Sequence, residues 1–462
     1  MSIIKSLLDT DAYKFTMGMA VYHTQPDSWV RIKFNCRNKG IKLGFLAEQV
    51  KAEVKALCKL KFSDNELVQL QEKMPYLKDD YMEFLRLLQL NYKYITIRNV
   101  NGELEVEVYG PWAYVIWFEV PVLAIVNELY FAGFATDKAA VEIEGHKRLM
   151  AKLEKLQYVD GLKYADFGTR RRYSHDWQNI VIRETLKFYR NIQRSHEFFV
   201  GTSNVYFAIK YNLPAIGTMA HEWFQGHQQA KGVSLADFQK VALERWSQEY
   251  RGLLGIALSD IIGFDAFLKD FDLHFSKLFD GCRHDSGDPF AWCEKLISHY
   301  IQLGIDPRTK TAVFSDGLDV GKMIKLFSAF SGRIKVSFGI GTNLTNDMGL
   351  EALQIVMKII EQNGNPTAKL SDSKGKGMCE QPWFEDLLRK TFNLENNSDD
   401  HVVEVLRRDL IMMNTKGDYY YSREVVKQTK HYGGIENYIR HILDRNNWGA
   451  PDWELDGQPP RR

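Results

Sequence analysis

The sequence lacks the features of a secreted, zinc-binding or strongly charged protein. Its five cysteines are an odd number without CxxC or CxxH spacing, so neither a disulfide framework nor a structural zinc site is expected. The 60 basic and 59 acidic residues nearly cancel, which gives no electrostatic reason to expect nucleic acid or an anionic membrane as a partner. Residues 1–15 lack the apolar stretch of a signal peptide, and no run approaches the roughly 18 residues of a membrane span. We therefore expect a cytoplasmic protein with reduced thiols.

The first 160 residues combine helical and strand patterns and are predicted to form an N-terminal α/β domain. Short stretches rich in β-branched or aromatic residues predict strands at 30–35, 94–100 and 103–109, the last two joined by a hairpin turn at Asn101-Gly102. Apolar spacing predicts helices over 6–22, 43–60, 64–90, 120–132 and 136–157. Tyr13 is expected near the start of the first helix.

Residues 161–380 follow a different pattern, in which short apolar runs end in small or acidic residues and helical stretches follow. The runs are YADFGT, FFVGTSN, LPAIGT, LGIALSD, FDGCRHDS, TAVFSD, KVSFGIGT and TAKLSD. Their polar ends at Asp260, Asp285, Asp316, Gly341 and Asp372 are separated by 25, 31, 25 and 31 residues. This repeat predicts parallel strands in a closed or nearly closed, irregular α/β barrel. The carboxyl ends of all strands then meet at one mouth, where distant residues share a site.

Residues 381–462 lose the repeat and are predicted to pack back on the N-terminal domain. The polar stretch 392–405 is expected to be a surface loop. Residues 409–414 and 418–422 are predicted to form a hairpin, and 438–445 a short helix. The tail after Asn446 has no periodicity.

The stretch 212–230, NLPAIGTMAHEWFQGHQQA, places a histidine at a chemically useful position. Residues 213–216 are predicted as a strand and the following residues as a helix that ends near 231–232. With Thr218 as N-cap, His221 lies in the first turn, where free N–H groups and the helix dipole favour negative charge. Such an imidazole can carry a phosphoryl group. The alternative is a packed or hydrogen-bonded histidine without a catalytic role.

Two further stretches offer groups for a flat, charged ligand. In FGTRRRYS (167–174), an aromatic ring precedes three arginines, which suits a planar ring and a phosphorylated partner; the alternative is a solvated basic turn. In RHDSGDP (283–289), Arg283 can hold a carboxylate and Asp285 a sugar hydroxyl or magnesium. The same letters also make a good turn before a helix.

The stretch SFGIGTNLTND (337–347) allows the backbone to approach a phosphate, with Gly341 and Thr342 at a predicted helix start. It lacks the ending of a Walker A loop and the third glycine of a dinucleotide fingerprint, so alone it is weak evidence. A zinc helix around His221 is excluded because the position four residues later is Gln225, where the HExxH motif requires histidine.

Together these stretches resemble the nicotinate phosphoribosyltransferase family. The motifs LLDTDAYKFTM, FGTRRRYS, GTSN, GTMAHEW, RHDSGDP, FSDGLD and FGIGTNLTND occur in the family's order and spacing. The resemblance implies an irregular α/β barrel with an N-terminal α/β domain, to which the C-terminal segment returns. It also implies transfer of phosphoribose to nicotinate, with ATP as co-substrate and Mg²⁺ as cofactor, through a phosphorylated histidine.

The resemblance also implies roles for individual residues. His221 is the histidine that is phosphorylated, with Thr218 a neighbour of nicotinate. Arg283 binds the nicotinate carboxylate and Phe167 stacks on the pyridine ring. Tyr13 stacks on the other face, typically from the second subunit of a homodimer.

For the phosphoribosyl substrate, the resemblance assigns Asp285 and Asp316 to the ribose hydroxyls. Arg170 binds phosphates, and Gly341 with Thr342 binds the 5′-phosphate. In nicotinamide-using relatives an acid stands where this chain has Ser203, so Ser203 favours the acid substrate, because a carboxylate there would repel nicotinate.

Three alternatives follow from the same residues. A nicotinamide-using phosphoribosyltransferase differs only in the amide it accepts. A metal-dependent barrel hydrolase would use the strand-end aspartates but lacks paired histidine ligands. A non-catalytic nucleotide sensor would keep Gly341 and Thr342 but would not need His221.

Overall fold

The computed structural model describes residues 2–134, 137–194, 198–373, 375–394, 411–413 and 419–421. The chain forms two compact units, Met1–Leu388 and Arg389–Arg462. In the second unit, β12 (Ile411–Met413) pairs antiparallel with β13 (Tyr419–Tyr421), which confirms the predicted hairpin. The predicted helix at 438–445 and the tail lie outside the described residues, as does most of the predicted loop at 392–405.

In the first unit, six parallel strands form one sheet in the order β5-β4-β9-β8-β7-β6. Their bounds are β4 (Tyr164–Asp166), β5 (Phe199–Thr202), β6 (Ile256–Leu258), β7 (Gly281–His284), β8 (Thr311–Phe314) and β9 (Lys335–Ile340). Six of the eight predicted runs therefore form strands. The other two, LPAIGT and TAKLSD, each make a single bridge, at Ala215 and Lys369.

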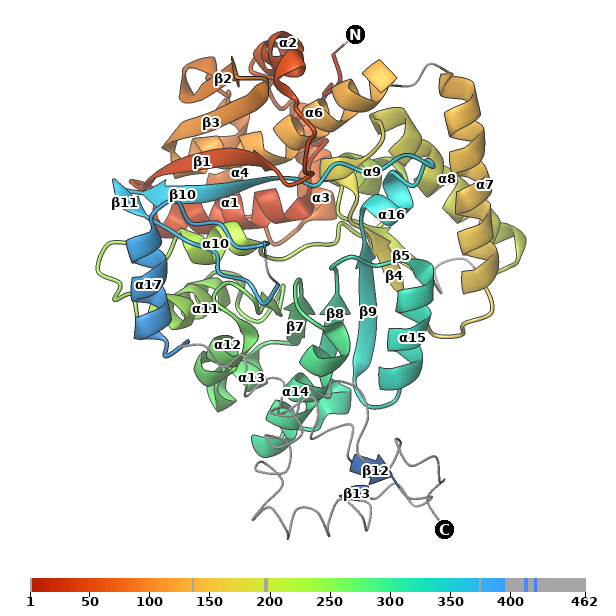
Figure 1. Ribbon diagram of the computed structural model, residues 1–462, viewed down its shortest axis with the longest axis vertical. Coiled ribbons are helices and arrows are strands. Elements are labelled where there is room, and N and C mark those ends of the chain that lie inside the picture. Colours follow the sequence, from red (N-terminus) through yellow and green to blue (C-terminus); the bar gives the residue numbers. More distant parts are fainter. Residues whose placement is uncertain are drawn as a thin grey trace. The chain divides into compact units, whose positions relative to one another are not determined.

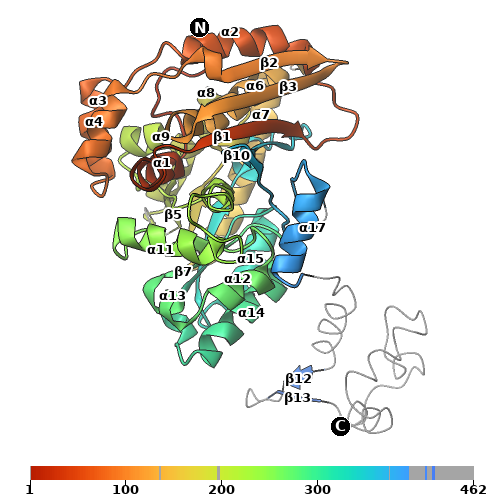
Figure 2. The same ribbon diagram turned by 90° about the vertical axis from the view of Figure 1, so that its left-hand side faces the viewer.

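Helices follow the parallel strands and cover them, as the repeat predicts (Figures 1 and 2). They are α8 (His175–Asn191), α9 (Val205–Lys210), α10 (His221–Gln225), α11 (Phe238–Tyr250), α12 (Phe264–Asp270), α13 (Leu273–Leu278), α14 (Pro289–Gln302), α15 (Val320–Phe330) and α16 (Thr342–Thr345). After each strand the chain runs back along a helix, so the carboxyl ends of the strands lie at the same edge of the sheet.

The parallel sheet is open among the described strands, whereas the sequence predicts a closed or nearly closed barrel. β5 and β6 are its two edges. After β5, the predicted strand at 213–216 makes only the bridge from Ala215 to Thr202, and the chain then enters α10 and α11. Loop and helix therefore occupy the stretch of sequence that would have to supply closing strands.

The N-terminal sheet is antiparallel and has the order β11-β10-β1-β3-β2. Its strands are β1 (Trp29–Cys36), β2 (Ile95–Val100), β3 (Glu103–Pro111), β10 (Ile355–Gln362) and β11 (Asn365–Pro366). The three predicted N-terminal strands are confirmed. Asn101 and Gly102 have φ of 53° and 88°, the left-handed backbone that a two-residue hairpin turn requires. The chain returns to this sheet at β10, so residues after β9 join both sheets (Figure 1).

The helices of this N-terminal part differ from the prediction at the first helix, at residues 64–90, and at residues 112–115, where a short helix was not predicted. They are α1 (Ala12–Thr24), α2 (Ala47–Leu57), α3 (Asp64–Lys73), α4 (Asp79–Leu87), α5 (Trp112–Val115), α6 (Glu119–Phe134) and α7 (Lys138–Leu156). The first helix begins at Ala12, six residues later than predicted, with Asp11 as N-cap. The single helix predicted over 64–90 is two helices, because Pro75 disfavours helical backbone at Met74 and breaks the hydrogen-bond pattern.

The stretch Trp112–Gly133 is long and apolar enough to cross a membrane, with a mean hydropathy of 1.6. The expectation that no run approaches such a length was therefore wrong. Its most apolar window is 78% buried inside the protein, and α6 packs against α2 and the turn Thr169–Arg171. A helix that is mostly covered by protein is apolar on most of its faces for that reason.

Gly281 lies so close to β8 that an added Cβ would stand 1.9 Å from the carbonyl oxygen of Thr311. Gly281→Ala is expected to push β7 from β8 and to lower the free energy of unfolding by about 2–3 kcal/mol. Urea denaturation measures the change. Gly133→Ala is the control, because a Cβ there meets nothing within 4 Å. Equal stability of the two variants would contradict this close contact.

Candidate active site

A cavity of about 370 Å³ lies at the carboxyl ends of the parallel strands. Ten of the eleven predicted site residues line it: Tyr13, Phe167, Arg170, Ser203, His221, Arg283, Asp285, Asp316, Gly341 and Thr342. Phe167, Ser203, Asp285 and Gly341 directly follow β4, β5, β7 and β9. The prediction that the strand ends converge on one site is confirmed.

Thr218 is the predicted residue that does not line the cavity. Its hydroxyl donates to the carbonyl of Ile256 at 2.8 Å, and its carbonyl accepts from the Thr16 hydroxyl at 2.6 Å. It is also not the N-cap, because α10 begins at His221 with Ala220 as N-cap. Thr218 therefore links α1 to β6, and His221 is still in the first helical turn.

His221 is buried and bound to a carboxylate. Its Nε2 lies 2.8 Å from Asp260 Oδ1 and 3.6 Å from Asp285 Oδ2. Burial and the positive charge of Lys369 lower the pKa of His221 to about 4, although Asp260 opposes them. The imidazole is therefore neutral near pH 7. Because a carboxylate only accepts, the proton stays on Nε2 and Nδ1 keeps its lone pair.

Asp260 binds several of the residues around His221. From the sequence it was predicted only as a strand-end position and not as a site residue. Besides His221, it accepts from the Ser286 hydroxyl at 2.6 Å and pairs with Lys369 Nζ at 3.0 Å. Burial raises the pKa of Asp260, but Lys369 and His221 outweigh burial and hold this pKa well below its usual range. Asp260 is thus a fixed anion behind the histidine.

Asp285 and Asp316 both line the cavity at the ends of neighbouring strands. Asp285 Oδ1 accepts from the Ser315 hydroxyl at 2.9 Å, and Asp316 pairs with Lys376. Burial raises the pKa of Asp285, but His221 and Arg283 hold it below its usual range. Ligand atoms of His221, Asp260 and Asp285 lie within 4.8 Å of one another.

The lining of the cavity has an excess of positive charge, although the charges of the whole sequence nearly cancel. Its lining contains four carboxylates, Asp11, Asp285, Asp316 and Asp319, against seven basic side chains, Arg37, Arg170, Arg171, Arg283, Lys358, Lys369 and Lys376. Burial lowers the pKa of Lys358 to about 8, against the attraction of Glu119. Burial and neighbouring arginines lower the pKa of Arg171 to about 10. An anion bound among these groups would relieve their repulsion, so the cavity suits a polyanionic ligand.

Four of these basic residues escaped the sequence prediction: Arg37, Lys358, Lys369 and Lys376. Lys358 interrupts the otherwise apolar start of β10, IVMKII. A lysine is rarely buried in such a strand without a function, and this was the available signal. Arg37 follows β1, and nothing in its local sequence marks it.

The aromatic walls come from one chain. Tyr13, in the first turn of α1, and Phe167, after β4, line the same cavity. The Arg170 guanidinium lies 5.7 Å from the centre of the Tyr13 ring. Gly339 makes room for Phe167, because a Cβ there would stand 2.2 Å from the Phe167 ring. The site therefore has both rings without Tyr13 of a second subunit.

Position 203 lacks an acid, yet this wall of the cavity contains one. The Ser203 hydroxyl donates to Asp11 Oδ1 at 2.7 Å. Burial raises the pKa of Asp11, while Arg170, with its Nε 3.5 Å from Asp11 Oδ2, opposes the rise. Ser203 thus binds a carboxylate from a different segment, so this wall of the cavity contains an acid although position 203 does not.

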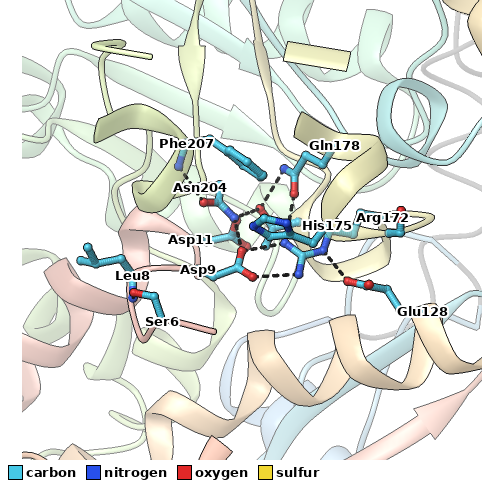
Figure 3. A network of polar contacts seen from close by, with 12 residues as sticks. Ser6, Leu8, Asp9, Asp11, Glu128, Arg172, His175, Gln178, Asn204 and Phe207 are labelled. Atoms are coloured by element: carbon cyan, nitrogen blue, oxygen red, sulfur yellow. Dashed lines mark hydrogen bonds and ion pairs between the residues drawn. The ribbon is translucent and has the colours of Figure 1, made fainter. Parts of the chain in front are cut away.

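The third arginine of FGTRRRYS is buried, so the alternative of a solvated basic turn was wrong for this residue. Arg172 Nη1 and Nη2 donate to the two oxygens of Asp9 at 2.6 and 2.8 Å, and its Nε donates to Glu128 at 2.9 Å. Asn204 Nδ2 also donates to Asp9, at 2.8 Å (Figure 3). This network fastens together the segments that carry Asp11 and Tyr13, Arg170, and Ser203.

Glu222 and His227, the residues that invite comparison with a zinc helix, are both held by protein groups. Glu222 binds Lys14 and accepts from Trp112 Nε1 at 2.9 Å. His227 Nδ1 hydrogen-bonds the carbonyl of Trp223 at 2.7 Å. All five cysteines are free, as expected.

Comparisons with known proteins all identify the same family. The model of the nicotinate phosphoribosyltransferase (NAPRTase) family matches residues 162–396, and the model of its N-terminal domain matches residues 8–127. The chain is 49% identical over 405 residues to a nicotinate phosphoribosyltransferase of Burkholderia mallei, covering 86% of this chain and 99% of the relative. A relative of the same name from Cupriavidus necator is 49% identical over 398 residues, covering 85% and 99%.

Solved structures agree with these relatives. Nicotinate phosphoribosyltransferase from Vibrio cholerae is similar with a TM-score of 0.79 and 38% identity, covering 88% of this chain and 98% of that chain. The enzyme of the same name from Porphyromonas gingivalis has a TM-score of 0.77 and 34% identity, covering 85% and 100%.

Arg172→Leu is expected to lower the free energy of unfolding by about 3–5 kcal/mol, because it leaves two buried carboxylates without their cation. Arg183→Leu is the control, since its pair with Glu184 is half exposed and is worth at most about 1 kcal/mol. Urea denaturation at several pH values measures both.

The pH dependence of the Arg172→Leu effect has a defined sign. In the folded protein, burial raises the pKa of Asp9, but Arg172 outweighs burial and holds it below its ordinary value. The stabilisation by the pair is therefore fully present above about pH 4 and is lost as the pH falls through the folded-state pKa. The stability difference from wild type should shrink in acid, and a difference that grows in acid would contradict this account.

Proposed function

This chain belongs to the nicotinate phosphoribosyltransferase family, and from that premise we propose how its cavity joins nicotinate to phosphoribosyl pyrophosphate in NAD biosynthesis. The products are nicotinate mononucleotide and pyrophosphate. We also propose that ATP hydrolysis is coupled to this transfer through phosphorylated His221. The incomplete ring of parallel strands acts in this proposal as an irregular barrel, with the substrates at its mouth.

Arg283 is the observation that carries the choice of nicotinate. It lines the cavity, and among the described residues its buried Nε has no hydrogen-bond partner. A buried guanidinium N–H without a partner is costly, and a planar carboxylate satisfies it. Nicotinate supplies that carboxylate with its ring between Tyr13 and Phe167. Nicotinamide supplies no charge for Arg283.

The phosphoribosyl substrate brings the negative charge that the cavity lacks. Asp285 and Asp316 accept hydrogen bonds from ribose hydroxyls, and Gly341 with Thr342 binds the 5′-phosphate. The pyrophosphate group takes the positions near Arg170 and the lysines Lys358, Lys369 and Lys376. Substrate binding therefore replaces cation–cation repulsion by attraction.

Magnesium fits the donor set in part. Asp285 is an ionised carboxylate in the cavity, and Mg²⁺ is usually held by one or two carboxylates together with substrate phosphates. Asp260 is the second carboxylate nearby, although His221 occupies one of its oxygens and Lys369 and Ser286 the other. Magnesium bound there would neutralise part of the charge on the pyrophosphate.

The chain's own residues then position the reaction. The lone pair of the pyridine nitrogen forms a bond to C1 of the ribose as the C1–oxygen bond breaks, and the electron pair leaves with pyrophosphate. No proton is transferred, so no general base is needed. Arg170 and the lysines stabilise the charge on the leaving group. Arg283 and the two aromatic rings fix the direction of attack.

ATP is used at His221 by a separate step. Nδ1 attacks the γ-phosphorus, the bond from that phosphorus to the bridging oxygen breaks, and ADP leaves with the electron pair. Asp260 holds the Nε2 proton and stabilises the positive ring. Water later cleaves the nitrogen–phosphorus bond and releases phosphate.

We extend the proposal to the oligomeric state and the cellular location of the protein. A homodimer is compatible with the site but not needed to supply Tyr13. A cytoplasmic location is supported by five free cysteines. The metal-dependent hydrolase and the nucleotide sensor are disfavoured because the cavity contains one histidine at the carboxylates and a full set of groups for two substrates.

Incubation of the protein with ATP, phosphoribosyl pyrophosphate and either nicotinate or nicotinamide tests the function. We expect a mononucleotide and ADP with nicotinate, and at least about 100-fold lower kcat/KM with nicotinamide, because Arg283 loses a charged partner worth about 2.7 kcal/mol or more. His221→Ala should lose ATP stimulation and the acid-labile phosphate. Product from nicotinamide alone would overturn the substrate assignment, and full ATP stimulation with acid-labile phosphate in His221→Ala would overturn the role of the histidine.

The low pKa of His221 predicts an unusual pH profile for its phosphorylation. An ordinary histidine is half protonated near pH 6.5, whereas His221 becomes protonated only near pH 4. The rate of phosphate incorporation from γ-labelled ATP should therefore be constant from pH 7 to about 5 and fall below that. Lys369→Met should move the midpoint upward, because a positive neighbour is removed. A wild-type midpoint near 6.5 would contradict the buried, neutral histidine.

A further inference from the structure

Glu222 directly follows His221 in the sequence, and the reaction proposed above gives it no role. Both residues lie in the first turn of α10. The Glu222 carboxylate does not reach the imidazole; it binds Lys14 and accepts from Trp112 Nε1. Asp260 is the residue that orients His221. Glu222 therefore faces away from the chemistry and into the interface between α10 and α1.

Lys14 is a buried cation shared by two carboxylates. Its side chain has no exposed surface, and its Nζ pairs with Glu222 and lies 2.7 Å from Glu119 Oε2. Burial lowers the pKa of Lys14, but the two carboxylates outweigh burial and raise it. Lys14 remains charged, and its position depends on the balance between α10 and α6.

Glu119, the second partner, contacts the substrate-binding residues. Its Oε2 lies 3.5 Å from the Tyr13 hydroxyl, and its Oε1 lies 3.9 Å from Arg170 Nη1. Tyr13 is also the neighbour of Lys14 in α1. A continuous chain of buried polar contacts thus runs from α10, through Lys14 and Glu119, to one aromatic wall and one phosphate-binding arginine.

We propose that Lys14 and Glu222 are positioning residues that couple the phosphorylation state of His221 to substrate binding at Tyr13 and Arg170. The inference rests on the proposed phosphorylation of His221. A phosphoryl group adds close to two negative charges one residue from Glu222 and attracts Lys14 toward α10. Glu119 then loses part of its cation and binds Arg170 and the Tyr13 hydroxyl more firmly. The physical basis is one cation with two alternative carboxylate partners.

The test compares the KM for nicotinate with and without ATP in the full chain. Wild type should show a lower KM with ATP, by about 5-fold or more, the lower range of measured couplings between sites. Lys14→Met and Glu222→Gln should reduce this ratio to about 2-fold or less while acid-labile phosphate still forms, and Lys14→Arg should restore part of it.

Lys310→Met is the matched control. Lys310 is also a buried lysine, but it donates to the carbonyls of Phe279 and Lys277 and lies just before β8, at the end of the sheet opposite the cavity. It should keep the wild-type ratio. A similar loss in Lys310→Met would assign the effect to general destabilisation and overturn the coupling.

The results distinguish a failure of the ATP coupling from a failure of the role proposed for Lys14 and Glu222. If wild type forms no phosphohistidine, or its KM does not respond to ATP, the proposed ATP coupling itself fails. If wild type shows both and Glu222→Gln keeps the full ratio, only the role of Lys14 and Glu222 fails. Glu222→Gln decides even if Lys14→Met does not fold, because glutamine preserves the size of the side chain and its hydrogen bond from Trp112.

Discussion

The buried pair between Arg172 and Asp9 is the interaction on which the site depends. Three segments far apart in the sequence must meet within one cavity: the start of α1, the turn after β4 and the end of β5. Backbone pairing joins β4 to β5, whereas the start of α1 belongs to neither sheet and has only a single bridge, from Asp11 to Asn204. Arg172 holds it by two parallel hydrogen bonds to Asp9, and Asn204 holds the same carboxylate from the end of β5. Such forked geometry fixes direction as well as distance.

A second constraint is the opposition between local and overall charge. The chain is close to neutral, yet its cavity has three more cations than carboxylates in its lining. Burial makes this excess costly, as the lowered pKa values of Lys358 and Arg171 show. A polyanionic ligand would relieve this cost, so the lining of the cavity favours such ligands.

The sequence predicted which residues meet at the strand ends better than it predicted the closure of the sheet that carries them. Strand-end residues such as Arg283, Asp285 and Gly341 could be placed because parallel strands send their carboxyl ends to a common edge, whatever the number of strands. Closure of a barrel depends on every strand being present, and loop and helix between β5 and β6 leave the sheet open. The prediction of Thr218 as N-cap was wrong because α10 begins at His221 with Ala220 as N-cap, and the Thr218 hydroxyl donates instead to the carbonyl of Ile256, which is distant in the sequence.

Residues that act through partners distant in sequence were the ones that sequence patterns missed. Lys358 lies in β10, which belongs to the N-terminal sheet but delivers its side chain to the cavity. Asp11 lies against Ser203 only because a bridge joins it to Asn204. No spacing rule connects these positions.

In the proposed function, this arrangement also bears on substrate selectivity. Asp11 places a carboxylate beside Ser203, so the serine at position 203 does not leave that wall of the cavity without an acid. We propose that the group that distinguishes the acid from the amide is Arg283, whose Nε has no hydrogen-bond partner in the described structure. Nicotinamide would leave the Arg283 guanidinium desolvated without a counter-charge, and its neutral amide would not recover that cost. In this proposal the cost to nicotinamide exceeds the repulsion that Asp11 exerts on nicotinate.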